Sequence, residues 1–214
     1  MVCFLQDDLT AEFIKNNRPH NMTILMNTLN TEFKEASELY KKGKYKEAYE
    51  KYLTLASEGN SESQVFLGWM ISNGIGVKKD INAGGGWFKR AALMGSSLGA
   101  FYYGLFLTIN GEDKDAFSWY LKAAKRGDTP GIFRMGYSYI YGKGVLVDTN
   151  KGYEYLLSAS AKGHLYARRE IAVLDMKGNR GLIYRIKGLG QFVNTILLTF
   201  IIHHYDAHSD RLRC

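Results

Sequence analysis

A histidine-rich stretch near the C-terminus has residue types that could bind a metal ion. Residues 203–208 read HHYDAH, and on a helix His204 and His208 would share one face. His203 and Asp206 would not join them on that face, and a structural zinc site takes four ligands. The sequence therefore predicts no metal site, and it offers no motif for a cofactor.

Motifs for catalysis are also missing from the sequence. No serine or cysteine nucleophile stands beside a recognisable histidine motif, and no paired-carboxylate motif occurs. Glycines 84–86 would suit a phosphate loop only between a strand and a helix, with Lys-Ser or Lys-Thr following, and neither condition is met. We therefore expect a protein that is not an enzyme, and we interpret the glycine run as a tolerated, locally weak stretch of helix.

A ten-residue phrase that recurs along the chain identifies the helices that must position the residues named above. The phrase occurs four times, each time with a glycine as its ninth residue. These four glycines lie 36, 32 and 36 residues apart, which is the spacing of stacked two-helix units. The phrases are KYLTLASEGN, WFKRAALMGS, WYLKAAKRGD and YLLSASAKGH, and the closing glycines are Gly59, Gly95, Gly127 and Gly163.

Positions counted from each closing glycine keep their character from unit to unit. Small residues stand eleven and three positions before it, and a large residue stands seven before it, so the three share one helix face. After the glycine, a small, a large and a small residue follow at four, eight and nine positions, which predicts a second helix packed closely on the first. The large residues before the glycines are Tyr52, Phe88, Tyr120 and Leu156, and those after them are Leu67, Tyr103, Met135 and Ile171.

Glycine-rich turns separate the two helices of a unit. They cover residues 73–77 and 141–145, and each is followed by an aspartate, Asp80 or Asp148, that suits a helix N-cap.

These elements resemble the Sel-one-like repeat, a longer relative of the tetratricopeptide repeat. Residues 68–95, with their LG, GxGV and WFKRAA elements, and residues 129–163 are similar to the full unit, and 97–127 to a shortened one. Residues 33–59 are more similar to a tetratricopeptide hairpin. The resemblance covers about residues 33–180. It implies an α-solenoid adaptor that assembles protein complexes.

The predicted fold is all-α: a solenoid of stacked antiparallel helix pairs with a C-terminal capping helix. We divide the chain into an N-terminal lead-in (1–30), partly disordered, the repeat solenoid (31–180) and a C-terminal capping or docking segment (181–214). Met1 and Met22 are both candidate native starts, because residues 1–20 lie outside the repeat pattern.

The C-terminal segment breaks the repeat. From 188 to 202 it carries no charged side chain, and these fifteen residues are fewer than the roughly twenty needed to cross a bilayer. We favour a helix that caps the last repeat. The alternatives are docking to a partner or contact with a membrane surface through 182–202, beside the cations Arg185, Lys187, Arg211 and Arg213.

Charge and cysteine content limit the cellular role. The net charge of +7 resides mainly in lysines and arginines at helix ends and turns, and no nucleic-acid-binding module is recognisable, so we expect no nucleic-acid partner. Cys3 and Cys214 form no disulfide framework, and the first residues lack the features of a secretion signal. We expect a cytoplasmic protein, with peripheral membrane association as the alternative.

The sequence favours a non-catalytic adaptor that binds partner proteins on the concave surface of the solenoid. Candidate contacts are residues on the inner helices outside the recognised packing positions. They are Gln64, Trp69, Phe101, Phe106, Arg134 and Tyr139. The alternative is an accessory subunit or peripheral membrane protein of an envelope or polysaccharide system that acts through the C-terminal apolar helix.

Overall fold

The computed structural model describes the backbone of residues 20–177 and 182–205 and the side chains of 31–177 and 186–198. Most of the predicted lead-in lies outside the described residues, as do both cysteines. Asp206 and His208 of the histidine-rich stretch lie outside them too, and His203 and His204 have no described side chain.

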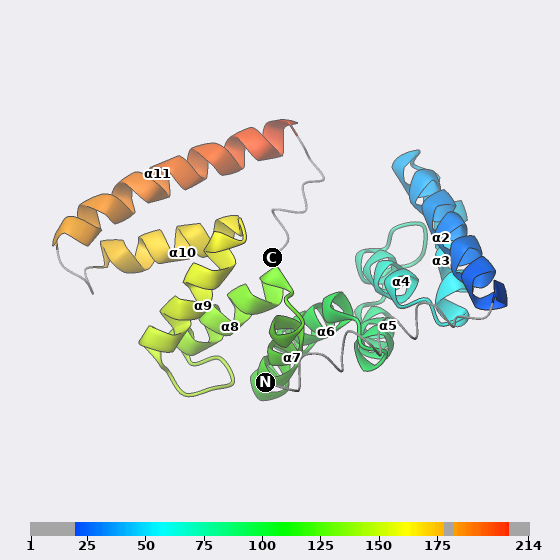
Figure 1. The fold of residues 1–214 in the computed structure, drawn as a ribbon, viewed down its shortest axis with the longest axis horizontal. Helices are drawn as coiled ribbons and strands as arrows, with labels where there is room; N and C mark the ends of the chain where they lie inside the picture. The colour runs from blue at the N-terminus through cyan, green and yellow to red at the C-terminus, as the bar shows by residue number, and fades with distance from the viewer. Residues whose placement is uncertain (1–19, 178–181, 206–214) are drawn as a thin grey trace.

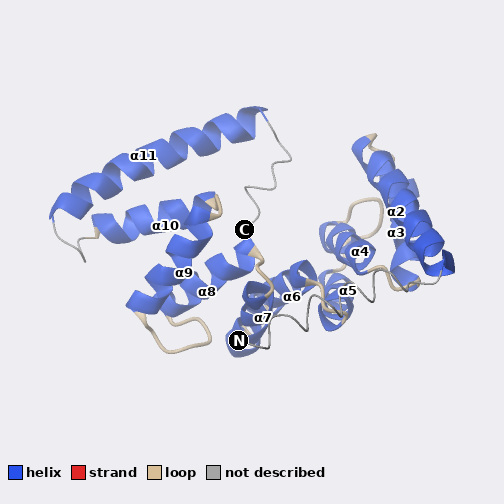
Figure 2. Ribbon diagram, viewed as in Figure 1, coloured by secondary structure: helices blue, strands red, loops and turns tan. Residues whose placement is uncertain are grey.

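Within the described residues the chain is helical and has no strand (Figure 2), which confirms the predicted all-α class. Consecutive helices pair antiparallel, and the pairs stack into an arc (Figure 1). The helices are α2 (His20–Lys41), α3 (Tyr45–Ser57), α4 (Ser61–Asn73), α5 (Ile81–Leu93), α6 (Ser97–Ile109), α7 (Asp113–Lys125), α8 (Thr129–Tyr141), α9 (Thr149–Ala161), α10 (Leu165–Met176) and α11 (Leu182–Tyr205).

Each closing glycine ends a unit as its position predicts. Gly59, Gly95, Gly127 and Gly163 have φ angles of 96°, 93°, 83° and 87°, in the left-handed region that glycine enters without a Cβ penalty. The chain therefore turns out of one pair and into the next at the same place in every unit.

Side-chain caps fix where the next helices start. Asp80 Oδ1 accepts the Ala83 backbone N–H at 2.9 Å, and Asp148 Oδ1 accepts that of Lys151 at 3.0 Å, which confirms both predicted N-caps. The residue directly after each closing glycine caps the first helix of the following pair in the same way. These caps are Asn60, Ser96, Asp128 and His164.

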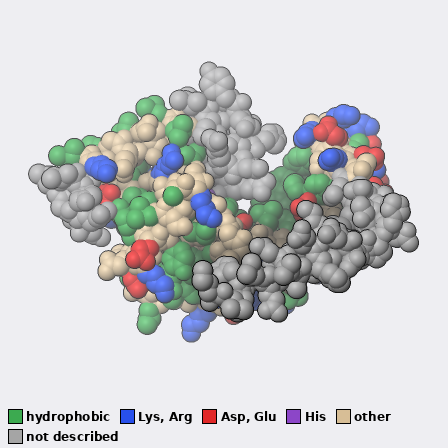
Figure 3. Space-filling model, viewed as in Figure 1, with side chains coloured by type: hydrophobic (Ala, Val, Ile, Leu, Met, Phe, Trp, Pro, Cys, Tyr) green, Lys and Arg blue, Asp and Glu red, His purple; other side chains and the backbone are tan. Residues whose placement is uncertain are grey.

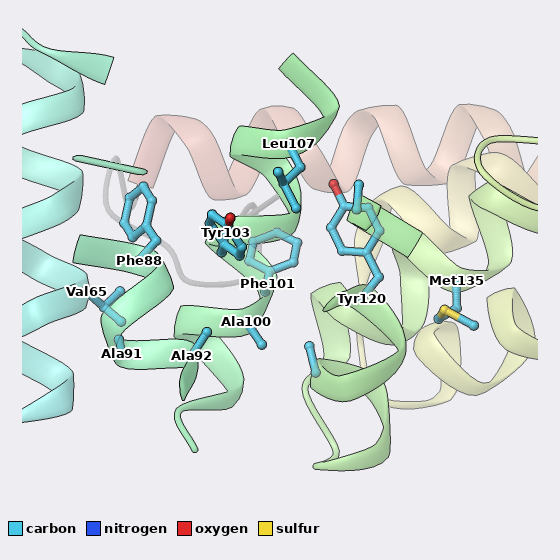
Figure 4. Packing of buried hydrophobic residues seen from close by; sticks show 12 residues of the cluster. Val65, Phe88, Ala91, Ala92, Ala100, Phe101, Tyr103, Leu107, Tyr120 and Met135 are labelled. Atoms are coloured by element: carbon cyan, nitrogen blue, oxygen red, sulfur yellow. The ribbon is translucent and has the colours of Figure 1, made fainter. Parts of the chain in front are cut away.

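The large residue seven positions before each closing glycine fills the core between helices. Tyr52, Phe88, Tyr120 and Leu156 are between 0% and 5% exposed. Figure 4 shows Phe88 and Tyr120 in the cluster that joins α4 to α8. The Tyr120 hydroxyl is also hydrogen-bonded to that of Thr108, 2.8 Å away, so its polar end is satisfied.

Small residues allow the two helices of a pair to approach closely. A Cβ on Gly68 would lie 2.9 Å from the Gly84 carbonyl oxygen, and one on Gly136 would lie 3.0 Å from that of Gly152. Larger side chains there would push α4 from α5 and α8 from α9.

Two of the three glycines 84–86 have a packing role. A Cβ on Gly84 would lie 2.0 Å from Ser72 Oγ, and one on Gly85 would lie 2.6 Å from the Phe106 ring. The interpretation of Gly85 as a tolerated weak point was therefore wrong: α6 packs over it. Gly86 is exposed and has nothing within 4 Å of its Cβ position.

Gly86→Ala is expected to raise the free energy of unfolding by about 1 kcal/mol, because alanine restricts the unfolded chain and suits a helix interior. Gly85→Ala, one residue away, is expected to lower the free energy of unfolding, because the added Cβ would force the Phe106 ring to move. Urea denaturation followed by circular dichroism measures both changes. A loss of stability in Gly86→Ala would contradict this account of the run.

The last helix covers the end of the solenoid. α11 packs along α10 (Figure 1), and a Cβ on Gly188 would lie 2.8 Å from the Ala172 carbonyl oxygen. This placement confirms the predicted capping helix. Among the residues that the structure describes, no helix has both the length and the apolar character required to span a membrane.

Candidate partner-binding surface

The first helices of the units line the inside of the arc. Figure 1 shows α4, α6 and α8 toward its hollow and α5 and α7 toward its outer side, and α4 also contacts α6 directly. Side chains on the inward helices are therefore the ones that a partner in the hollow would meet.

One face of these helices is only partly covered by neighbouring helices. Residues three, seven, ten and fourteen positions after the closing glycine share a face, and on α4, α6 and α8 none of them is fully buried. We call these twelve residues the inner face. They are Glu62, Phe66, Trp69 and Asn73 on α4; Leu98, Tyr102, Leu105 and Ile109 on α6; and Pro130, Arg134, Tyr137 and Tyr141 on α8.

The inner face is mostly apolar and aromatic. All four of its residues on α6 are hydrophobic, and Ile109 is 71% exposed. Figure 3 shows hydrophobic side chains in the hollow between the two arms of the arc. Partly exposed apolar side chains that gather on one face mark interaction sites more often than single exposed side chains do.

Aromatic stacking holds part of this face in place. The Phe66 ring stacks on Tyr52 of the preceding pair, with centroids 5.4 Å apart, and the Tyr102 ring stacks on Phe88 at 5.0 Å. Since these two inner-face rings rest on core rings, they are already held in place, and binding a partner would cost little of their side-chain entropy.

Arg134 occupies the corresponding position on α8. Burial raises the pKa of Tyr120, and the hydrogen bond to Thr108 and the charge of Arg134 partly oppose this rise. The buried Nε of Arg134 has no hydrogen-bond partner among the described residues, and none of the ion pairs found there involves this arginine. The inner face therefore contains a cation whose hydrogen-bonding capacity is incompletely used.

A groove extends the inner face toward the N-terminal helices. Its volume is about 490 Å³, and it lies between α2, α4 and the start of α6. Phe66 and Leu98 line it together with Phe33. The groove is open and has both apolar and polar walls, which suits a peptide segment better than an enclosed small molecule.

Two of the six residues predicted to bind a partner lie on the inner face, Trp69 and Arg134. Trp69 is half-buried, with its ring 5.9 Å from that of Tyr40. These two remain candidates for partner contact.

The assignment of Gln64 and Phe101 as residues outside the packing was wrong. Gln64 is 1% exposed and donates its amide to the Ala56 carbonyl oxygen at 3.1 Å, and Phe101 is 0% exposed. Both lie on the side of their helices that packs against neighbouring helices, so a partner in the hollow cannot reach them without unfolding.

Phe106 and Tyr139 are half-buried packing residues. Phe106 lies over Gly85 and stacks on Tyr103. Tyr139 packs between the rings of Phe117 and Tyr155, and the Lys151 ammonium lies 4.6 Å from its centroid. Tyr139 thus faces α7 and α9 rather than the hollow.

The sequence prediction missed the residues that give the inner face its apolar character. These are Phe66, Tyr102, Leu105 and Tyr137. The repeat spacing could have identified them. Residues seven and ten positions after a closing glycine share a helix face, and that face lies opposite the small packing residues.

Two buried carboxylates on α10 tie the last units together. The Tyr141 hydroxyl donates to Glu170, and the Tyr153 hydroxyl donates to Asp175 at 3.2 Å. Burial, with the bond to Glu170 as the second cause, raises the pKa of Tyr141 well above its usual range. These carboxylates accept structural hydrogen bonds, and no group of three or more His, Cys, Asp or Glu residues in the described part of the chain is arranged to hold a metal ion.

Comparisons with known proteins agree with the repeat fold. The model of the Sel1 repeat family matches residues 61–96, 98–128 and 129–164. No curated protein matches the chain.

Solved structures show the same fold. A Sel1 repeat protein from Oxalobacter formigenes is 26% identical with a TM-score of 0.66, over 78% of this chain and 72% of that one. A protective antigen of uropathogenic Escherichia coli with an SLR fold is 20% identical with a TM-score of 0.71, over 79% of this chain and 38% of that one. MamA is 15% identical with a TM-score of 0.55, over 77% of this chain and 95% of that one.

Proposed function

Since this chain carries three Sel1 repeats in a helical solenoid, we propose that it is a non-catalytic scaffold that binds partner proteins on the inner face. Proteins with Sel1 repeats are generally protein-interaction scaffolds. The observation that carries the proposal is the mostly apolar face of α4, α6 and α8, on which no residue is fully buried.

The chemistry of the inner face also indicates what kind of segment it binds. Leu98, Tyr102 and Leu105 offer apolar contacts, so the partner segment carries a row of apolar side chains. Arg134 can donate to a carboxylate, and a charge-assisted bond there would fix the segment in one register. The expected ligand is therefore an apolar peptide segment with one acidic group.

Substitutions on the inner face are expected to weaken partner binding without unfolding the chain. Once a partner has been captured from native cells, Tyr137→Ala is expected to reduce its affinity by about tenfold or more, as truncated aromatic anchors do. Arg134→Gln is expected to weaken binding of the same partner, because the carboxylate loses its charged donor. Titration calorimetry with the purified partner measures both losses.

The matched control is Leu93→Ala, which removes a leucine that is 68% exposed on α5, a helix toward the outer side of the arc. Its affinity should equal that of the unsubstituted chain. Unchanged affinity after simultaneous substitution of Leu105, Arg134 and Tyr137 would refute the inner face as the binding surface.

A further inference from the structure

The capping helix has an apolar side that points away from the solenoid. Five aliphatic residues on α11 remain about half exposed or more although the helix packs on α10, and their spacing places them on one side of the helix. We call them the outer row. They are Ile186 (67% exposed), Leu189 (57%), Val193 (50%), Ile196 (49%) and Leu197 (56%).

Among the described side chains of α11, the two residues that are fully buried are small or polar. Gly188 and Thr195 are buried, and Thr195 donates its hydroxyl to the Gln191 carbonyl oxygen. Within 186–198, the exposed outer row is therefore more apolar than the two fully buried positions. A helix that only capped the solenoid would present a polar outer side.

In the stretch 162–198, the exposed charges that the structure describes have a single sign. Between residues 162 and 198, the described acidic side chains are Glu170 and Asp175, and both are buried as acceptors of tyrosine hydroxyls. The described charged side chains that are exposed in this stretch are all cationic: Lys162, Arg168, Arg169, Lys177 and Lys187.

We propose that the outer row of α11 docks the protein on an anionic membrane surface. An aliphatic row accompanied by lysines and arginines is the combination with which a helix lies in the interface of a bilayer that contains acidic lipids. The row enters the acyl boundary, and the surrounding cations interact with the headgroups. This proposal is independent of partner binding on the inner face, because the two surfaces share no residue.

A second copy of the chain is a poorer occupant of the outer row. Two copies related by a two-fold axis would bring the same cationic surroundings together, and no exposed described acidic residue of 162–198 could offset the repulsion. An anionic bilayer complements both features of the surface at once.

Vesicle co-sedimentation of the full chain tests the proposal. The chain is expected to sediment with vesicles of phosphatidylcholine that contain phosphatidylglycerol, much less with phosphatidylcholine alone, and less as salt rises. The variant Leu189→Ser, Val193→Ser, Leu197→Ser should bind about tenfold more weakly or worse, because three inserted side chains are lost. Arg169→Gln with Lys187→Gln should weaken binding to the acidic vesicles alone.

The control removes comparably exposed aliphatic residues elsewhere: Leu93→Ser, Leu146→Ser and Val147→Ser, which are 68%, 89% and 63% exposed. It should bind vesicles like the unsubstituted chain, and circular dichroism should show the same helix content for all variants. Equal binding to both vesicle types, or binding unaffected by the outer-row variant, would overturn the proposal. So would a dimer in sedimentation velocity that the outer-row variant converts to monomer, since a second copy would then occupy the row.

Discussion

Phe101→Ala is expected to lower the free energy of unfolding by about 3–5 kcal/mol, the usual cost of removing a fully buried phenylalanine. Phe101 is 0% exposed, and its ring lies 5.3 Å from that of Tyr102 and 6.3 Å from that of Tyr120. It belongs to the cluster that runs from Val65 on α4 to Met135 on α8 (Figure 4). The substitution would leave a cavity at the interface between neighbouring helix pairs, and the stability of a solenoid depends on such interfaces.

Urea denaturation followed by circular dichroism measures the loss. Ile109→Ala on the same helix is the control, because its side chain is 71% exposed, and it should change stability by no more than about 0.5 kcal/mol. Phe101→Ala that remained as stable as the unsubstituted chain but lost a partner would return Phe101 to the binding surface.

Gly144→Ala is expected to lower the free energy of unfolding by more than about 2 kcal/mol, since two costs combine. Gly144 has a φ of 73°, and an added Cβ would lie 2.0 Å from the Asp113 carbonyl oxygen at the start of α7. The turn between α8 and α9 rests at this point on the backbone of the preceding pair. Gly76 rests on the Tyr45 carbonyl oxygen in the same way, with a Cβ position 2.4 Å away.

Gly111→Ala separates the two costs. Gly111 has a φ of 80°, but nothing lies within 4 Å of its Cβ position, so only the left-handed backbone penalty of about 1–2 kcal/mol applies. Thermal unfolding of the two variants in parallel measures the difference. Equal losses would mean that the contact between the turn and α7 adds no stability.

Local features of the sequence were sufficient to predict the fold. The closing glycines and the large residue seven positions before each of them recur in every unit, and the aspartate caps recur at α5 and α9. Each of these features is determined within one helix or one turn. A signal of this kind needs no knowledge of long-range contacts.

The candidate surface depended on contacts that lie outside a single unit. Phe101 is buried because α4, α7 and α8 contribute to the cluster around it, and Gly85 is needed because Phe106 of the next pair lies over it. The direction of the outer row on α11 likewise depends on which side of that helix packs on α10. Exposure of a residue in a solenoid is decided by the neighbouring units, so spacing alone misplaced these residues.

Photo-crosslinking from the two sides of the arc tests the central claim most directly. A photoreactive phenylalanine derivative is placed at Leu105 on the inner face in one protein and at Leu93 on the outer side in another, and both are irradiated in native cells. The scaffold account predicts that position 105 crosslinks reproducibly to one protein and that position 93 does not. Crosslinking of that protein from position 93 with none from position 105 would contradict it.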